Sequence, residues 1–137
     1  MKTNGNAGVG SGRCECGSEK TRQQCCDRFL EAGQLAKTPE QLMRSRYSAF
    51  ARGGHGNYLL QTWFPPTAPQ SSELELSQRT QNWTRLEVLT KSQQGDDGMV
   101  EFKAHYKDSD EQDAVLHEKS IFKRLAGRWL YVGGEVS

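Results

Sequence analysis

All four cysteines of this 137-residue chain fall in one short segment, at Cys14, Cys16, Cys25 and Cys26. Thiols in this C-x-C-x8-C-C pattern can form disulfides, exchange electrons or bind a metal. Residues 1–12 show no secretory signal, so we expect a reducing compartment, in which structural disulfides are rare. A redox centre seldom needs four neighbouring thiols. Four soft thiolates suit tetrahedral Zn²⁺, so the spacing favours a structural metal site, with Fe²⁺ in the same ligand set as the chemical alternative.

The expected metal-binding segment spans residues 14–30 and follows a flexible N-terminus at residues 1–13. Gly17 and Ser18 allow the chain to reverse after the first cysteine pair, and a helical turn over residues 20–26 would return the second pair. A segment this short has no core of its own, so metal binding would supply most of its folding free energy. Four basic side chains are candidates to offset the negative charge of a metal with four thiolates: Arg13, Lys20, Arg22 and Arg28.

The charge balance limits the partners that this chain can have. Lys and Arg number 18 against 17 Asp and Glu, a formal net charge of +1, which argues against a strongly cationic nucleic-acid binder or a polybasic membrane binder. The expected metal-binding segment contains no aromatic ring before Phe29 for stacking on bases. No apolar run approaches the roughly 20 residues that span a bilayer. We therefore expect protein partners and no membrane span.

A strong helix start precedes the main part of the chain. Thr38 can cap the helix, Pro39 suits its first position, and Gln41 can complete a capping box. The helix is expected to run to Arg52 and to end at the glycine pair that follows.

The two faces of this helix differ in polarity. The apolar face carries Leu42, Met43, Tyr47, Ala49 and Phe50, and the polar face carries Arg44, Ser45, Ser48 and Arg52. Arg46 is the anomaly, because it lies within the apolar face. It is either a side chain that extends to solvent along the edge of this face or a buried guanidinium, which would require a carboxylate partner.

Shorter elements complete an α+β layout. Residues 57–64 predict a helix that Pro65 and Pro66 end, and Ser72 with Glu75 predicts a helical turn to about Gln81. Alternating polarity then predicts four strands, at residues 83–90, 99–106, 114–125 and 129–132. Helices followed by hairpin-connected strands favour helices packed on an antiparallel sheet.

One carboxylate lies on a face that resembles a core. Alternation within the third strand places Glu118 beside Leu116, Ser120 and Phe122. It could be a general base with a raised pKa in an apolar pocket. The interpretation we favour is an ion pair with Arg46 that stabilises the junction of helix and sheet. No Ser/His/Asp order, phosphate loop or HExxH motif is present, so the sequence favours a protein without enzymatic activity.

The segment C-x-C-G-S-x-K-x-x-x-x-C-C resembles the SEC-C motif, the metal-binding tail of the SecA translocase ATPase. The rest of the chain resembles the YchJ family of SEC-C proteins in five stretches, at residues 42–50, 57–63, 100–106, 116–122 and 127–132. The resemblance implies an N-terminal zinc knuckle with Cys14, Cys16, Cys25 and Cys26 as ligands. It also implies a nuclear-transport-factor-2-like (NTF2-like) cone at residues 38–137, with helices packed on a curved antiparallel sheet. Glu19 departs from the motif, which usually has glycine there, and suggests a different turn.

The resemblance leaves two classes of function open. The favoured one is a cytoplasmic zinc-binding adaptor whose knuckle contacts a protein partner linked to export or translation. The alternative is a cone that binds or converts a small molecule in a pocket around Glu118, Arg46 and Tyr106. Cones of this kind often pair through their sheets, so a homodimer is also a prediction, by fold analogy.

Overall fold

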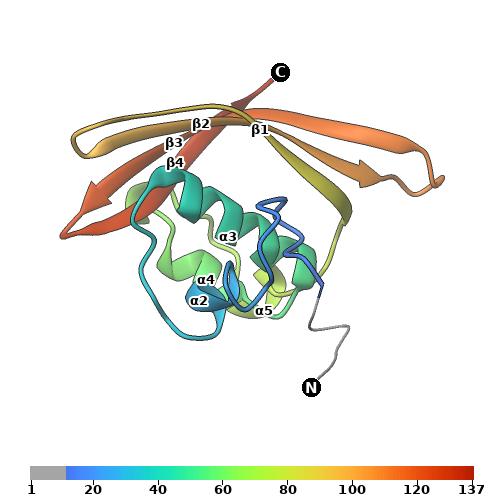
Figure 1. Ribbon diagram of the computed structural model, residues 1–137, viewed down its shortest axis with the longest axis horizontal. Helices are drawn as coiled ribbons and strands as arrows, with labels where there is room; N and C mark the ends of the chain where they lie inside the picture. Colours follow the sequence, from blue (N-terminus) through green and yellow to red (C-terminus); the bar gives the residue numbers. More distant parts are fainter. Residues whose placement is uncertain (1–11) are drawn as a thin grey trace.

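The computed structural model describes residues 12–137, so the flexible N-terminus expected at residues 1–13 lies almost entirely outside the described residues. Figure 1 shows a curved four-stranded sheet on one side and the helices on the other. The strands are β1 (Asn82–Gln94), β2 (Asp97–Lys107), β3 (Asp113–Leu125) and β4 (Arg128–Val136). The helices are α2 (Asp27–Leu30), α3 (Pro39–Arg52), α4 (Gly56–Gln61), the 3₁₀ helix η1 (Pro65–Thr67) and α5 (Glu73–Leu76). The predicted α+β class is confirmed.

The central helix, α3, follows its local sequence signals. The Oγ1 atom of Thr38 accepts a hydrogen bond from the backbone N–H of Gln41 at 3.1 Å, and Pro39 lies in the first turn. Gly53 ends the helix with a φ of +75°, which glycine adopts without steric cost. The predicted helix up to Arg52 is therefore confirmed.

The predictions for the two shorter helices were too long. α4 ends at Gln61 rather than at Phe64, because the chain then becomes extended and pairs with β4. There the backbone N–H of Phe64 donates to the carbonyl of Tyr131, and the N–H of Tyr131 donates to the carbonyl of Thr62, both at 2.8 Å. α5 has the predicted capping box of Ser72 and Glu75 but ends at Leu76.

The four strands form an antiparallel meander in the order β1-β2-β3-β4. Both outer strands are longer than predicted, since β1 and β4 continue to Gln94 and Val136 along their neighbours. The alternation of β2 is confirmed, with Val100, Phe102 and Ala104 all buried. These residues face α3, and the core lies between that helix and the sheet.

The predicted polar face of α3 is wrong in part. Ser45 and Ser48 are fully buried at 0% exposure, because residues 12–30 and α4 cover the side of the helix that does not face the sheet. Ser45 is within hydrogen-bond distance of the Tyr58 hydroxyl, with its Oγ 2.6 Å from the Tyr58 oxygen. A helix buried on both sides keeps small hydroxyls inside only where partners satisfy them.

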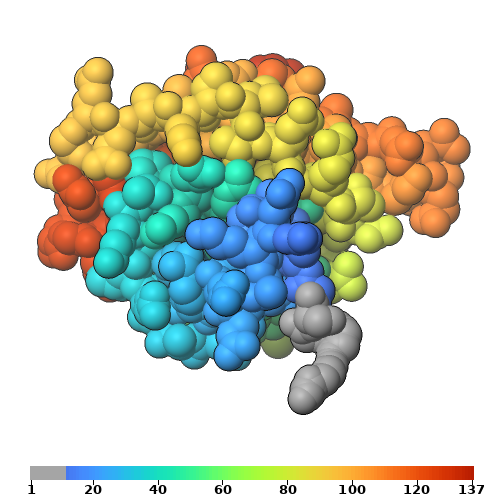
Figure 2. All heavy atoms as spheres, viewed as in Figure 1, coloured from blue at the N-terminus to red at the C-terminus, as the bar shows by residue number. Residues whose placement is uncertain are grey.

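The cysteine segment, residues 14–30, packs on the rest of the molecule. Figure 2 shows it in blue beside α3, below the yellow β1 strand. The four cysteines and Phe29 belong to the same buried cluster as Leu42 and Val100. No helix within residues 12–137 is long and apolar enough to cross a membrane.

Candidate metal centre and cavity

The first cysteine pair sits in a tight turn. The backbone N–H of Cys14 donates to the carbonyl of Lys20 at 2.7 Å, and the N–H of Gly17 donates to the carbonyl of Cys14 at 3.2 Å. Glu19 adopts a φ of +71°, a left-handed conformation that glycine adopts more easily than other residues do. The chain therefore closes this turn at a steric cost, and the different turn expected from the departure at this position stays a prediction.

The second cysteine pair lies at the start of α2. The carbonyl of Cys26 accepts hydrogen bonds from the N–H groups of Phe29 and Leu30, at 3.0 and 2.9 Å. The helical turn predicted at residues 20–26 is wrong in position, since residues 22–26 form turns and the helix begins at Asp27. Phe29 is buried at 4% exposure and anchors the turn in the core.

The four sulfur atoms converge with spacings that suit one metal ion. All four Sγ atoms lie within 4.8 Å of one another, and every one of these cysteines is buried. The Sγ of Cys25 is 3.5 Å from that of Cys16 and 3.9 Å from that of Cys26. Tetrahedral Zn–S bonds of about 2.3 Å place sulfur atoms about 3.8 Å apart. The cluster can therefore hold a metal ion with small side-chain adjustments.

Protonation of the thiols follows from their mutual contacts. Hydrogen bonds from the thiols of Cys16 and Cys26 lower the pKa of Cys14. Hydrogen bonds to Cys14 and Cys16 raise the pKa of Cys26, and the bond to Cys14 raises the pKa of Cys16 to about 11. Without a bound metal, neighbouring sulfurs would therefore share protons. A divalent cation would displace these protons, so metal affinity is expected to increase with pH.

A charged network that the sequence analysis missed holds this segment on α3. The Nε atom of Arg52 lies 3.1 Å from Oε1 of Glu15, and its Nη1 lies 2.5 Å from Oδ1 of Asp27. The Ser48 hydroxyl also donates to Glu15, at 2.6 Å. Arg44 donates to the carbonyl of Cys16 at 2.5 Å.

The expected neutralising cations are mostly not the ones closest to sulfur. Among the described contacts of basic side chains, Nη2 of Arg52 lies 3.9 Å from Sγ of Cys14, while Arg28 donates to the backbone carbonyl of Cys25. Arg13 bonds the backbone of Glu19, and Arg22 pairs with Glu15. The sequence does show Glu15 between two cysteines and Arg52 at the end of the predicted helix. Only the fold reveals that the two side chains are in contact.

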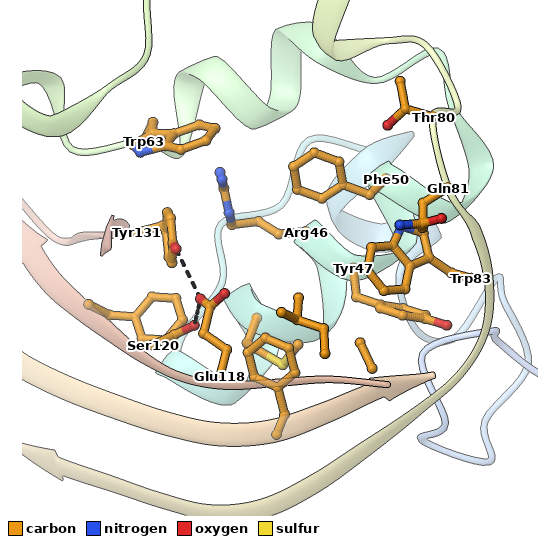
Figure 3. Close-up of a pocket in the computed structure, with 15 residues that line it drawn as sticks. Arg46, Tyr47, Phe50, Trp63, Thr80, Gln81, Trp83, Glu118, Ser120 and Tyr131 are labelled. Carbon is orange, nitrogen blue, oxygen red and sulfur yellow. Dashed lines mark hydrogen bonds between the residues drawn. The ribbon is translucent and has the colours of Figure 1, made fainter. Parts of the chain in front are cut away.

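A cavity of about 340 Å³ lies between α3 and the sheet. Arg46 lines the cavity and is buried, at 5% exposure. The interpretation in which its side chain extends to solvent is therefore wrong. The guanidinium carbon of Arg46 packs against the rings of Trp63 and Tyr131, 4.5 and 4.7 Å from their centroids (Figure 3). Burial lowers the pKa of Arg46 to about 10, so the group stays charged at neutral pH.

The predicted ion pair between Arg46 and Glu118 is not formed, since no nitrogen–oxygen distance between them is within 4.0 Å. Glu118 faces the cavity, as expected, but it accepts hydrogen bonds from Ser120 at 2.6 Å and Tyr131 at 3.0 Å. Aromatic rings surround Arg46 in place of a carboxylate. Tyr106 does not line the cavity. Its ring packs edge-on against the ring of Trp83, with the two ring centroids 5.3 Å apart.

The family model described as "YchJ, middle NTF2-like domain" matches residues 38–134. The chain belongs to the YchJ family. A UPF0225 protein of Streptomyces coelicolor is 40% identical to this YchJ-family chain over 125 residues, which cover 89% of it and 94% of the relative. The resemblance found in the sequence is thereby confirmed.

Two solved structures agree with the arrangement. The solution structure of a SEC-C motif containing protein from Rhodopseudomonas palustris is 34% identical, with a TM-score of 0.81 over 90% of this chain and 98% of that chain. The crystal structure of a SEC-C motif containing protein from Psychrobacter arcticus is 25% identical, with a TM-score of 0.75 over 94% and 85%. Both support the predicted knuckle followed by an NTF2-like domain.

Proposed function

We propose that this YchJ-family chain is a zinc-binding adaptor without enzymatic activity. The observation that carries the proposal is the convergence of four buried thiols from Cys14, Cys16, Cys25 and Cys26. Four protein ligands complete a tetrahedral shell and leave no open position for a substrate or an activated water. The metal would therefore act by holding residues 14–30 in shape on α3.

Zinc is the metal proposed because a buried structural site has no need of redox chemistry. Fe²⁺ in the same four thiolates is the alternative, and the two metals differ in visible absorption after oxidation. Because metal binding requires free thiols, we place the protein in the cytoplasm, where thiols remain reduced.

The adaptor role rests on what the knuckle, residues 14–30, presents to solvent. Its outward surface is polar and consists of Gly17, Glu19, Lys20, Arg22, Gln23 and Gln24. The mixed charge of this surface suits a protein partner better than a nucleic acid. Since the motif resembles the tail of SecA, we propose a partner in protein export or translation. Homodimerisation through the sheet is a separate proposal, which sedimentation equilibrium can check.

The metal is tested on protein purified under reducing conditions without added metal. Elemental analysis is expected to find about one zinc per chain, as a closed four-ligand site requires, and Cys26→Ser is expected to lose it. Ser18→Ala is the matched control, because the Ser18 hydroxyl lies 3.0 Å from Sγ of Cys25 without belonging to the ligand set. A wild-type protein that folds without any metal overturns the proposal.

The adaptor role needs its own comparison. Three baits are used in parallel: wild type, Cys26→Ser, and a Lys20→Glu/Gln23→Glu variant whose changes lie on the exposed surface and leave the thiols intact. A specific partner is expected to bind the wild type and to be lost with both variants. If the double variant retains its metal and captures the same proteins as the wild type, the knuckle surface is not the recognition site.

A further inference from the structure

The cavity beneath the sheet divides into an apolar end and a polar end. Phe50 and Trp83 line the apolar end, and Arg46 and Glu118 line the polar end (Figure 3). Its volume of about 340 Å³ falls in the range of small-molecule sites. Thr80, also a lining residue, is exposed, so the cavity reaches the surface.

Arg46 brings unused hydrogen-bond donors to this cavity. Its Nη1 atom donates to the carbonyl of Leu59 at 2.8 Å and to Oγ1 of Thr62 at 2.7 Å. Within residues 12–137, no acceptor is found for its Nε and Nη2 groups. The centroids of the Trp63 and Tyr131 rings are only 5.4 Å apart, so the two rings do not enclose the guanidinium, and an acceptor in the cavity can reach it. A buried N–H without an acceptor is costly, so a bound acceptor would be stabilised there.

Glu118 brings the complementary acceptor. Its Oε2 atom accepts hydrogen bonds from Ser120 and Tyr131, while Oε1 has no donor among the residues that the structure describes. The polar end of the cavity therefore holds one positive and one negative group that do not contact each other. An anion attracted by Arg46 would be repelled by Glu118, and a cation attracted by Glu118 would be repelled by Arg46, so the pair favours neither charge.

We infer that the cavity binds a small neutral aromatic amide or lactam. Its carbonyl oxygen would accept from the free N–H groups of Arg46, and its N–H would donate to Oε1 of Glu118. The aromatic ring would lie at the apolar end against Phe50 and Trp83, where ring-to-ring contact adds to the burial of apolar area. This inference extends beyond the metal-dependent adaptor role and does not depend on it.

Three probes of nearly identical shape test the inference: benzamide, benzoate and benzamidinium. The chain has three tryptophans, of which Trp63 and Trp83 line the cavity and Trp129 does not. In two-dimensional ¹H–¹⁵N spectra of the full chain, benzamide is expected to shift the indole signals of Trp63 and Trp83 with a Kd of about 1 mM. The Trp129 signal is expected to stay in place, and the two charged probes are expected to bind at least about tenfold more weakly.

Substitution of the carboxylate sharpens the test. Glu118→Gln removes the negative charge but keeps an amide oxygen for Ser120 and Tyr131, so benzoate is expected to bind this variant more tightly than benzamide does. Glu101→Gln is the matched control, because Glu101 is on the adjacent strand β2 and bonds His117 outside the cavity. A charged probe that binds the wild type best overturns the ligand class. If no probe shifts the Trp63 and Trp83 signals, or if Trp129 shifts equally, the cavity is not a ligand site.

Discussion

Arg52, in the last turn of α3, holds the carboxylate of Glu15, with Nε of the arginine 3.1 and 3.2 Å from the two carboxylate oxygens. Glu15 is the residue between the first two cysteines, so this pair joins the metal-binding turn directly to the central helix. Both side chains are largely shielded, at 17% and 19% exposure. The knuckle is thus fixed by a charged contact as well as by the apolar packing of Phe29.

Breaking this pair is expected to loosen the knuckle. In a double-mutant cycle of Glu15→Gln and Arg52→Gln, we expect a coupling of about 1–2 kcal/mol, because the two groups are in direct contact and partly shielded. Urea unfolding of the metal-loaded protein measures it. Arg22→Gln is the control, since Arg22 also pairs with Glu15 but is 51% exposed, and its loss is expected to change stability by less than about 0.5 kcal/mol. A coupling near zero would show that the pair does not fix the knuckle.

Metal removal is expected to unfold the knuckle before the cone. The segment at residues 14–30 has one short helical turn, α2, and depends on the cysteine cluster for its shape. Chelation should lower the unfolding temperature by about 10 °C or more. Hydrogen exchange should then show rapid exchange in residues 14–30 and retained protection at Val100 and Phe102. Equal loss of protection in both regions would mean that the metal supports the whole fold.

Replacing Glu19 with glycine is expected to stabilise the knuckle. Glu19 has a φ of +71°, a conformation that costs a residue with a Cβ atom more than it costs glycine. We expect Glu19→Gly to raise the free energy of unfolding by about 0.5–1 kcal/mol. The neighbouring Lys20→Gly is the control, because its φ is not positive and it should gain nothing. Chemical denaturation measures the free energy of unfolding of both variants. Equal effects of the two changes would show that the positive φ of Glu19 is not the cause.

Two adjacent glycines in β4 are expected to respond differently to alanine. A Cβ atom on Gly134 would collide with the carboxylate of Glu118, whereas one on Gly133 would meet open space. Gly134→Ala should therefore cost about 1–3 kcal/mol, and Gly133→Ala should change stability by less than about 0.5 kcal/mol. Thermal unfolding gives both values. If Gly134→Ala leaves the stability unchanged, the side chain of Glu118 can adopt another conformation that avoids the new methyl group.

Acid is expected to weaken the contact of Glu40 with its two cations. Burial by itself raises the pKa of Glu40, but hydrogen bonds from Lys91 and Arg44 outweigh it and lower the pKa below the ordinary 4.5. A carboxyl with a lowered pKa in the folded state adds stability that is fully present above its ordinary pKa and is lost as pH falls through the folded value. The difference in unfolding free energy between wild type and Glu40→Gln should thus be constant above about pH 5 and shrink below it.

Urea unfolding from pH 3 to pH 7 checks this dependence, because taking the difference between the two proteins cancels the titration of all other groups. Lys91→Gln is a useful comparison, since it removes one cation while Arg44 remains 2.9 Å from the Glu40 carboxylate. A difference that is the same at every pH would contradict the assignment.

The parts of the fold that could be predicted depend on signals within a few residues. The cap at Thr38, the glycine after Arg52 and the alternation from Val100 to Ala104 each act locally, and each was confirmed. The cysteine spacing likewise indicated a cluster. Only eight residues separate its two cysteine pairs, so a local turn is enough to bring the four sulfurs together.

The remaining parts depend on contacts between distant segments. Ser45 and Ser48 have the polarity of a solvent-facing side, and only the position of the knuckle and α4 on α3 makes them buried. Arg46 was expected to have a carboxylate partner, but Trp63 and Tyr131 arrive from beyond α4 and from β4. The sequence pattern of α3 contains no information on which rings would surround it.

The short pairing between Trp63 and Tyr131 also bears on self-association. An unpaired strand edge offers free N–H and C=O groups to the edge of another molecule and so invites aggregation. The extended segment from Thr62 to Phe64 occupies the outer edge of β4 at Tyr131. On the opposite edge of the sheet, β1 has register irregularities between Trp83 and Arg85 and between Val88 and Thr90, and such irregularities disturb the regular spacing that a new strand requires. Both edges are therefore poor templates for fibre growth.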